Sequence, residues 1–286
     1  MDIIWPGGAA AALTISFDDG YAATYESTVS SLQQRGMYAT YHIIPERVGK
    51  NFGGLETAGW EQWGAAARLG HEIGCHGFDH SPMAGWLCNI RRLFINLRSI
   101  PERRGYLRQL LATMRALHRW QGHSASSPDP QVSRRSQRPD LVSARRQISQ
   151  MLADQPIESF AYPYGLYNRA ARDDVQAAGF TTARTLNYGL NTLASDPFCL
   201  RGVSLTSVMA LSDLSSWIKR ACEQGAWLVL VLHLVAEDNP LGYPYYCSVS
   251  TWQRLLDVLE QHSLWITTQS QAARHLLRTS HEHSHA

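Results

Sequence analysis

Lysine is nearly absent from this 286-residue sequence: Lys50 and Lys219 are the only two, so arginine supplies almost all of the 26 basic residues. Against 24 acidic residues the formal net charge is +2, which indicates no polyanionic partner for the chain as a whole. The charges are unevenly distributed, since thirteen arginines lie between positions 91 and 146 with only Glu102, Asp129 and Asp140 against them. That segment is a basic block in a near-neutral protein.

Paired cysteine motifs are also missing. The five cysteines (Cys75, Cys88, Cys199, Cys222 and Cys247) are odd in number and widely spaced, which argues against a disulfide framework and a structural zinc knuckle. The chain has no apolar run near the roughly 18 residues that a membrane span needs. Its N-terminus lacks a basic region, and Pro6 and Gly7 interrupt the apolar stretch, so we expect no signal peptide and a cytoplasmic location, with membrane association left open.

What the sequence does have is an alternation of apolar strands and amphipathic helices, and its 44% hydrophobic content can build a core. The expected strands are Ala11 to Phe17, Tyr38 to Ile44, Glu72 to Cys75, Ser159 to Tyr162, Thr181 to Leu186, Leu200 to Leu205, Ala226 to Leu234 and Leu264 to Thr267. The expected helices are Ala22 to Arg35, Glu61 to Leu69, Arg169 to Ala178, Ser212 to Glu223, Thr251 to Gln261 and Gln269 to Arg278. This order predicts an α/β fold with a parallel sheet inside a layer of helices.

Residues 84–139 break the alternation, and we interpret them as an insertion. Their first half is basic and amphipathic at helical spacing, and their second half has the composition of a flexible loop. A lid, an oligomer contact, or binding to an anionic membrane surface or nucleic acid remain open roles for it. The histidine-rich tail, residues 279–286, is expected to fray.

Polar residues follow four of the expected strands. FDDG, from Phe17 to Gly20, ends the first strand, GHEIGCHGFDH (70–80) and FAYPYG (160–165) end two others, and His233 ends the most apolar one. Because active sites of parallel α/β folds gather at the carboxyl ends of their strands, we expect these clusters to face one rim.

His76 and His80 are four residues apart, so one helical turn after the strand would point both imidazoles the same way. A carboxylate from another strand end would complete a set of two histidines and one acid, which catalytic zinc sites use. The alternative to a metal-binding role is that the two histidines lie on the surface and have this spacing by chance.

SFDDG, the HxxxH pair, FAYPYG and the strand-end VLH together resemble the polysaccharide deacetylase family, the NodB-homology domain of carbohydrate esterase family 4, and its FAYPYG-type subgroup. The resemblance runs from about Leu13 to Thr267. It implies an irregular (β/α) barrel of about seven strands, with residues 1–286 as a single domain around the insertion.

The resemblance also implies a role for each motif residue. Asp18 would be the general base, and Asp19, His76 and His80 would bind a divalent metal, most often zinc, with cobalt or nickel in some relatives. His233 would protonate the leaving amine. The backbone N–H of Tyr164 would stabilise the oxyanion, and the groove would be lined by Tyr162, Pro163 and Tyr164.

Two positions depart from the family pattern. The arginine that commonly orients the catalytic base is replaced by Ala161, so the partner of Asp18 is open, with Arg201 as one candidate. The acid that supports the catalytic histidine cannot be placed either, and Asp196 and Asp213 are weak candidates.

The sequence therefore predicts a metal-dependent hydrolase that removes the acetyl group from an N-acetylated sugar, glycan or glycan precursor. One alternative keeps the fold and the metal but acts on a non-sugar amide or cyclic ureide. Another is a non-catalytic descendant that binds anionic membrane or nucleic acid through residues 84–139.

We expect no specific nucleic acid partner, and the sequence does not indicate an oligomeric state. His42 and Cys75 are interpreted as core residues, and His71 and Glu72 are not expected to bind metal.

Overall fold

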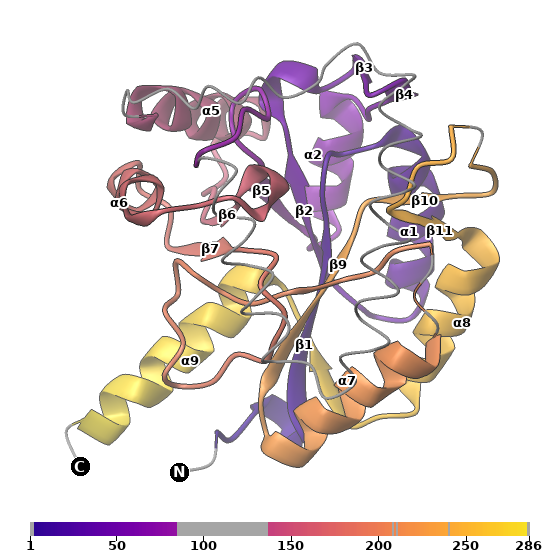
Figure 1. Cartoon of the computed structure of the whole chain (residues 1–286), viewed down its shortest axis with the longest axis vertical. Coiled ribbons are helices and arrows are strands. Elements are labelled where there is room, and N and C mark those ends of the chain that lie inside the picture. Colours follow the sequence, from indigo (N-terminus) through magenta and orange to yellow (C-terminus); the bar gives the residue numbers. More distant parts are fainter. Residues whose placement is uncertain (1–2, 85–136, 208, 210, 240, 285–286) are drawn as a thin grey trace.

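A curled sheet of parallel strands forms the centre of the molecule (Figure 1). The computed structural model describes residues 3–84, 137–207, 209, 211–239 and 241–284. Within them the strands run in the order β7-β6-β5-β2-β1-β9-β8, and β12 also pairs with β1. Their bounds are β1 (Ala11–Phe17), β2 (Ala39–Ile43), β5 (Glu72–Cys75), β6 (Ser159–Ala161), β7 (Thr182–Arg184), β8 (Val203–Ser204), β9 (Trp227–Leu232) and β12 (Leu264–Ile266).

The two central strands are apolar on both faces. Every residue of β1 and of β9 is buried, as expected for parallel strands covered on both sides. Along one edge of β1, its first half pairs with β12 and its second half with β2, while β9 runs along the other edge. The sheet therefore branches at β1, which makes the barrel irregular.

Hydrogen bonds also bring the two ends of the sheet together. The strand β7 pairs with residues 197–200, which lie just before β8: the N–H of Leu200 donates to the carbonyl of Ala183 over 3.0 Å, and the N–H of Thr185 donates to the carbonyl of Leu200 over 2.8 Å. The predicted α/β fold, an irregular barrel of about seven strands, is confirmed.

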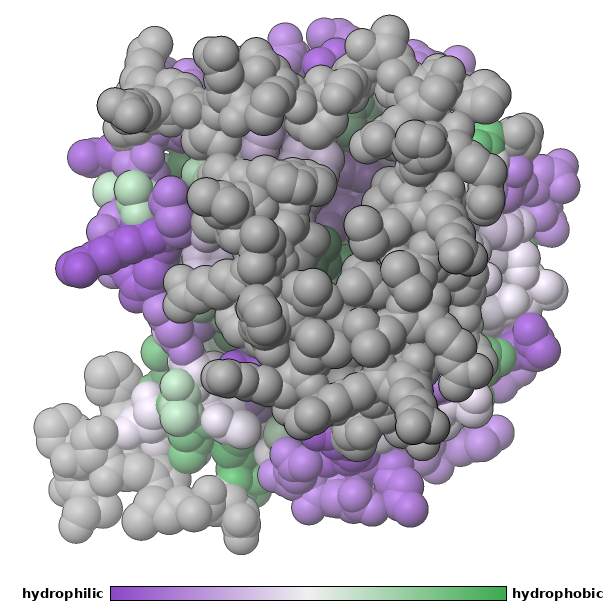
Figure 2. Space-filling view, viewed as in Figure 1, coloured by the Kyte–Doolittle hydropathy of each residue, from purple (hydrophilic) through white to green (hydrophobic). Residues whose placement is uncertain are grey.

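Helices surround this sheet (Figure 1). They are α1 (Ala22–Gln34), α2 (Trp60–Arg68), α5 (Arg138–Met151), α6 (Arg169–Ala177), α7 (Leu211–Gln224), α8 (Val249–Glu260) and α9 (Gln269–Ser284). The helix α7, for example, packs its buried apolar residues against β1 and β9, and its outer side is hydrophilic (Figure 2). Asn168 and Ser248 cap α6 and α8 by accepting a hydrogen bond from the backbone three residues ahead. None of the described helices is long and apolar enough to cross a membrane.

Several elements differ from the sequence-based expectation. The helix α5 was not expected, and neither were the hairpin of β3 (Asn51–Phe52) and β4 (Leu55–Glu56) or the small parallel pair of β10 (Leu234–Ala236) and β11 (Tyr246–Ser248). The helix α9 continues beyond Arg278 to Ser284, into the tail that was expected to fray. Almost all of the expected insertion, residues 84–139, lies outside the described residues.

Candidate functional site

The polar clusters that follow β1, β5 and β9 meet at the carboxyl end of the sheet. Asp18 directly follows β1, and its N–H donates to the carbonyl of Leu232 on β9. His76 directly follows β5, and its N–H donates to the carbonyl of Ile43 on β2 over 2.8 Å. These backbone hydrogen bonds continue the sheet ladder by one residue, so the first functional side chain of each cluster stands on a rigid element.

His76 and His80 come together through a loop and not through the helical turn expected from their spacing. No helix is present between them. Gly77 and His80 both have left-handed backbone, with φ of 78° and 70°, and the loop turns there. The carboxylate of Asp79 accepts hydrogen bonds from the N–H and the hydroxyl of Ser81 over 2.9 and 2.8 Å, which stabilises the turn.

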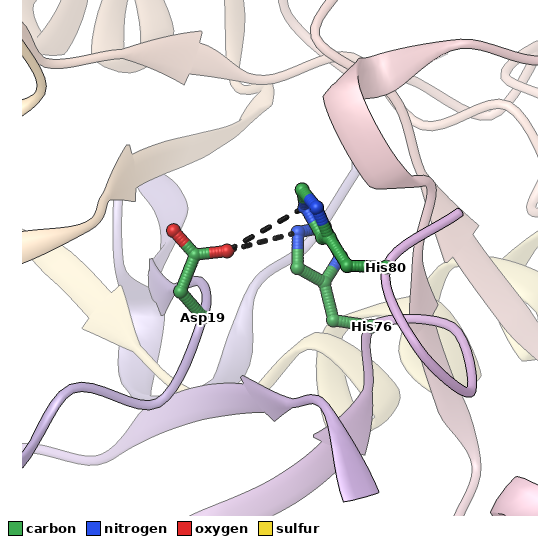
Figure 3. Close-up of side chains that lie close together, drawn as sticks. All are labelled: Asp19, His76 and His80. Atoms are coloured by element: carbon green, nitrogen blue, oxygen red, sulfur yellow. Dashed lines mark ion pairs between the residues drawn. The ribbon is translucent and has the colours of Figure 1, made fainter. Parts of the chain in front are cut away.

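Asp19, His76 and His80 form a compact group able to hold a metal ion (Figure 3). Oδ1 of Asp19 lies 3.7 Å from Nε2 of His76 and 3.6 Å from Nε2 of His80, and one ligand atom from each residue lies within 4.8 Å of the others. Figure 3 shows this oxygen turned toward both imidazoles. Two imidazoles and one carboxylate are a donor set that suits Zn²⁺ and related divalent ions.

In Asp19 and His76, the polar atom that faces away from the group forms a hydrogen bond with a neighbouring residue. The hydroxyl of Tyr243 donates to Oδ2 of Asp19 over 3.2 Å, and Nδ1 of His76 donates to the carbonyl of Ala161 over 2.8 Å. The second contact leaves a lone pair on Nε2 of His76. Oδ1 of Asp19, in contrast, is buried without a hydrogen-bond partner among the described residues. A buried carboxylate oxygen of this kind fits a cation ligand.

Asp18 is buried among basic groups. Its Oδ1 accepts a hydrogen bond from Nη2 of Arg184, on β7, and its Oδ2 lies 3.8 Å from Nε2 of His76 and 3.7 Å from Nε2 of His233. Burial alone would raise the pKa of Asp18, but the charge of Arg184, with smaller contributions from the surrounding histidines, outweighs burial and lowers that pKa below its ordinary value. Asp18 is therefore an ionised carboxylate in a buried site.

His233 stands where the chain passes from β9 to β10. The hydroxyl of Thr24, on α1, donates to the carbonyl of His233 and accepts from the N–H of Val235, over 2.8 and 3.0 Å. The ring of Tyr245 stacks on the imidazole at 4.7 Å. Burial lowers the pKa of His233, and the negative charges of Asp18 and Asp19 oppose this effect.

The acid expected beside His233 is not found in the described part of the chain, where Nδ1 of His233 is buried without a hydrogen-bond partner. The carboxylate of Asp196 is engaged by Nε of Arg172 at 2.7 Å and by the N–H of Phe198 at 2.9 Å. Asp213 lies in the first turn of α7.

The three residues expected to line a groove differ in exposure. Tyr162 is 1% exposed, and its hydroxyl donates to the carbonyl of Phe198, so it packs in the core, and its contact with substrate stays a prediction. Pro163 is also buried, close beneath Gly77. Tyr164 is half-buried, with its ring 4.4 Å from that of His80 and a φ of 58°. Asp19, His80 and Tyr164 thus share a left-handed backbone, a strain that concentrates at functional sites.

Sequence reasoning missed two neighbours of the site, Arg184 and Tyr243, and interpreted a third, His42, as a core residue, which its burial confirms. Arg184 and His42 are both 0% exposed, and Nδ1 of His42 lies 3.8 Å from Oδ1 of Asp18. The signal for Arg184 was an arginine inside an expected strand of the central sheet, since an arginine buried there needs a partner. Arg201, the candidate considered instead, donates from Nη1 to the carbonyl of Tyr188. Tyr243 lies in an irregular segment, where periodicity gives no signal.

Comparison with known proteins shows the family of this chain. The family model described as "Polysaccharide deacetylase" matches residues 8–183, more than half of the chain. The chain belongs to the polysaccharide deacetylase family. This membership supports a deacetylase, which is a hydrolase; the FAYPYG-type subgroup stays a prediction. None of the curated proteins matches.

Of three similar solved structures, the first shows the fold of this polysaccharide deacetylase domain. A protein of Mycobacterium smegmatis assigned to the polysaccharide deacetylases is 13% identical, with a TM-score of 0.57, and the match covers 97% of this chain and 94% of that one. IcaB from Ammonifex degensii is 19% identical over 74% of this chain and 72% of its own, with a TM-score of 0.46. The deacetylase PplD of Streptococcus pyogenes, in complex with acetate, is 16% identical over 71% and 69%, with a TM-score of 0.47.

Proposed function

We propose that the protein is a metal-dependent N-deacetylase of an N-acetylated sugar, glycan or glycan precursor, which releases acetate and a free amine. The observation that carries the proposal is the convergence of Asp19, His76 and His80 next to a second carboxylate, Asp18, and a second type of proton carrier, His233. Family membership supports an acetyl group as the part that is removed from the substrate.

Asp19, His76 and His80 are the proposed metal ligands. Three protein donor atoms leave at least one coordination position of a divalent ion for water or substrate. A divalent ion held there, most readily Zn²⁺ and alternatively Co²⁺ or Ni²⁺, would supply Lewis acidity to the acetyl carbonyl and lower the pKa of a water molecule.

Asp18 is the proposed general base. Its pKa is held below the ordinary value, so the carboxylate is ionised at neutral pH and can accept a proton. Of its two oxygens, Oδ2 faces the nitrogens of His76 and His233 at 3.8 and 3.7 Å, and this oxygen is the one placed to take the proton of an attacking water.

His233 is the proposed general acid. Its Nε2 lies 3.7 Å from Oδ2 of Asp18, so the proposed acid and the proposed base face each other in one site. Proton transfer from His233 to the amide nitrogen lets the amine leave as the tetrahedral adduct collapses to acetate.

The backbone N–H of Tyr164 is the proposed oxyanion donor, and its ring is the proposed contact for the sugar. The left-handed backbone at Tyr164 reverses the chain direction directly after Pro163, beside His80. A half-buried aromatic face at the edge of a site suits the apolar face of a pyranose ring.

The test is acetate release from a panel of N-acetylated monosaccharides, oligosaccharides, nucleotide sugars and non-sugar N-acetyl amides, with a cyclic ureide assayed beside them by the loss of its intact ring. The wild type is assayed as prepared, after chelation, and after addition of Zn²⁺, Co²⁺ or Ni²⁺. His76→Ala is compared with His262→Ala, the same change on a partly exposed histidine after α8.

We expect acetate only from N-acetylated sugars, loss of that activity on chelation and in His76→Ala, and normal activity in His262→Ala. Turnover restricted to a non-sugar amide or the ureide would contradict the sugar substrate. No turnover at full metal occupancy would contradict the hydrolase and favour a non-catalytic protein.

A further inference from the structure

Arg184 is the one buried lysine or arginine in the described residues. Its side chain is 0% exposed and forms an ion pair with Asp18, which is 2% exposed. A guanidinium stays charged in proteins, and its burial is unfavourable unless a carboxylate is paired with it. Buried ion pairs are weak evidence of stabilisation, so the reason for this pair has to be sought in the geometry of the site.

The ion pair gives the two carboxylate oxygens of Asp18 different surroundings. Nη2 of Arg184 donates to Oδ1, the oxygen that also faces the core histidine His42 at 3.8 Å. Oδ2 is thereby left to the side of His76 and His233. An aspartate without such a contact can rotate about its last side-chain bond, which has a broad torsional preference.

We propose that Arg184 is a positioning residue that holds Oδ1 of Asp18 and so keeps Oδ2 directed at the reacting water. The inference rests on the proposed function, in which Asp18 is the general base. Arg184 does not contact the reacting atoms in this scheme and acts only through Asp18.

The residues around Arg184 hold its guanidinium and leave space for its side chain, which extends from β7 toward Asp18. Its Nη1 donates to the carbonyl of Thr185 over 3.4 Å, so both ends of the guanidinium are held. A Cβ atom at Gly202 would lie 3.3 Å from Cδ of Arg184, so glycine at that position leaves room for the side chain.

Arg184 also takes the place of a residue missing from the adjacent strand. It is the register partner of Ala161 in the β6–β7 pair, and paired positions point to the same face of a sheet. Ala161 is fully buried and small, which leaves space beside it for the long side chain of Arg184. Position 161 is where the family resemblance implies an arginine, so the same charge reaches Asp18 here from the next strand.

The first variant is Arg184→Ala, assayed with the best acetylated substrate. We expect kcat to fall about 100-fold, the usual cost of a misplaced catalytic group, while KM and the zinc dissociation constant change by less than about threefold. Arg201→Ala is the matched control, because it removes an arginine near the same sheet end that hydrogen-bonds a backbone carbonyl and not Asp18. It should keep the wild-type kcat.

The second variant exchanges the two register partners, Ala161→Arg with Arg184→Ala. Because it keeps one guanidinium on the same face of the sheet, it tests position and charge even if Arg184→Ala alone folds poorly. We expect it to fold and to recover at least about tenfold of the lost kcat. A folded exchange variant with no recovery would overturn the positioning role, as would a folded Arg184→Ala with kcat within about twofold of the wild type.

Failure of the inference can be told apart from failure of the proposed function. If Asp18→Asn abolishes acetate release and Arg184→Ala does not, the positioning role is wrong and the function stands. If the wild type releases no acetate, the function is wrong, and a crystal structure of Arg184→Ala then tests the inference alone: a rotated Asp18 carboxylate supports it, and an unchanged one overturns it.

Discussion

Each of the two aspartates in this site has one carboxylate oxygen that accepts a hydrogen bond and one that faces the histidines. In Asp18, Oδ1 is held by Arg184 and Oδ2 faces the histidines. In Asp19, Oδ2 accepts from Tyr243 and Oδ1 faces His76 and His80. The two adjacent carboxylates are therefore oriented by different elements, β7 for one and the segment between β10 and β11 for the other, and this separation allows them different chemical roles.

The contact of Tyr243 with Asp19 predicts an effect on metal affinity. We expect Tyr243→Phe to weaken zinc binding by about tenfold, because hydrogen bonds to a metal ligand orient it and typically contribute 10- to 100-fold to affinity. Competition with a chromophoric chelator measures the dissociation constant.

Tyr246→Phe is the control for the lost hydroxyl, since Tyr246 donates to the carbonyl of Glu237 in the same region without touching the site. Equal zinc affinities in Tyr243→Phe and the wild type would show that the hydrogen bond does not orient Asp19.

The motif residues could be predicted from the sequence, whereas their orienting partners could not. Asp18, Asp19, His76 and His233 sit at or next to strand ends, where the position along the chain fixes the position in space. Arg184 reaches Asp18 from β7, across the barrel interior, and this contact depends on the curl of the whole sheet. Tyr243 depends on the path of an irregular segment, which periodicity does not specify.

Among the elements, β5 is the strand whose packing most directly places His76. Its Gly74 lies against β2 and β6: a Cβ at this position would be 2.4 Å from Oγ of Ser159 and 2.6 Å from Cδ2 of His42. The strand can therefore approach its neighbours only because residue 74 has no side chain.

Two glycine-to-alanine changes should have opposite effects on stability. We expect Gly74→Ala to lower the free energy of unfolding by about 1–3 kcal/mol through overpacking. Gly64→Ala, in the middle of α2, should raise it by about 0.5–1 kcal/mol, because alanine is the better helix former. A Cβ there would meet only the ends of Arg68 and Leu152, at 3.5 and 4.0 Å. Denaturant unfolding measures the change in the free energy of unfolding for each variant. Changes of the same sign in the two variants would contradict the prediction.

Element prediction succeeded where periodicity was strong. The strands β1 and β5 match their expected bounds, and β9 and the expected helices lie within about two residues of theirs, except that α9 ends six residues later. The missed helix α5 carries its buried residues Leu141, Ala144 and Ile148 at helical spacing, but its many polar and basic residues made it look like the end of the basic block. The loop from His76 to His80 was misassigned because a spacing of four is compatible with a helix and with a glycine turn alike.

At the scale of the whole molecule, buried ionisable groups make folding depend on pH. His71 is 4% exposed, its Nδ1 accepts the N–H of Ala39 over 3.2 Å, and burial lowers its pKa to about 4. It is neutral in the folded protein near pH 6, whereas in the unfolded chain it binds a proton with its ordinary pKa of 6.5. The unfolded state therefore binds more protons between these values, and stability rises with pH there.

This difference predicts acid sensitivity. The free energy of unfolding should fall by up to about 3 kcal/mol as the pH drops from 6.5 toward 4, beyond the losses due to other groups. His71→Gln should flatten this part of the pH profile, whereas His262→Gln, on a partly exposed histidine, should not. Urea unfolding at several pH values measures the slopes, and equal slopes in His71→Gln and the wild type would contradict the assignment.

One buried site is proposed to bind the metal ion through one set of residues and to transfer protons through another, and a metal titration of activity tests this division most directly. Acetate release by metal-free wild type is followed as Zn²⁺ is added, beside Asp18→Asn. We predict that wild-type activity rises to a plateau at about one ion per chain, and that Asp18→Asn binds the same equivalent but turns over at least about 100-fold more slowly. Full activity in the metal-free protein, or wild-type turnover by Asp18→Asn, would contradict the account.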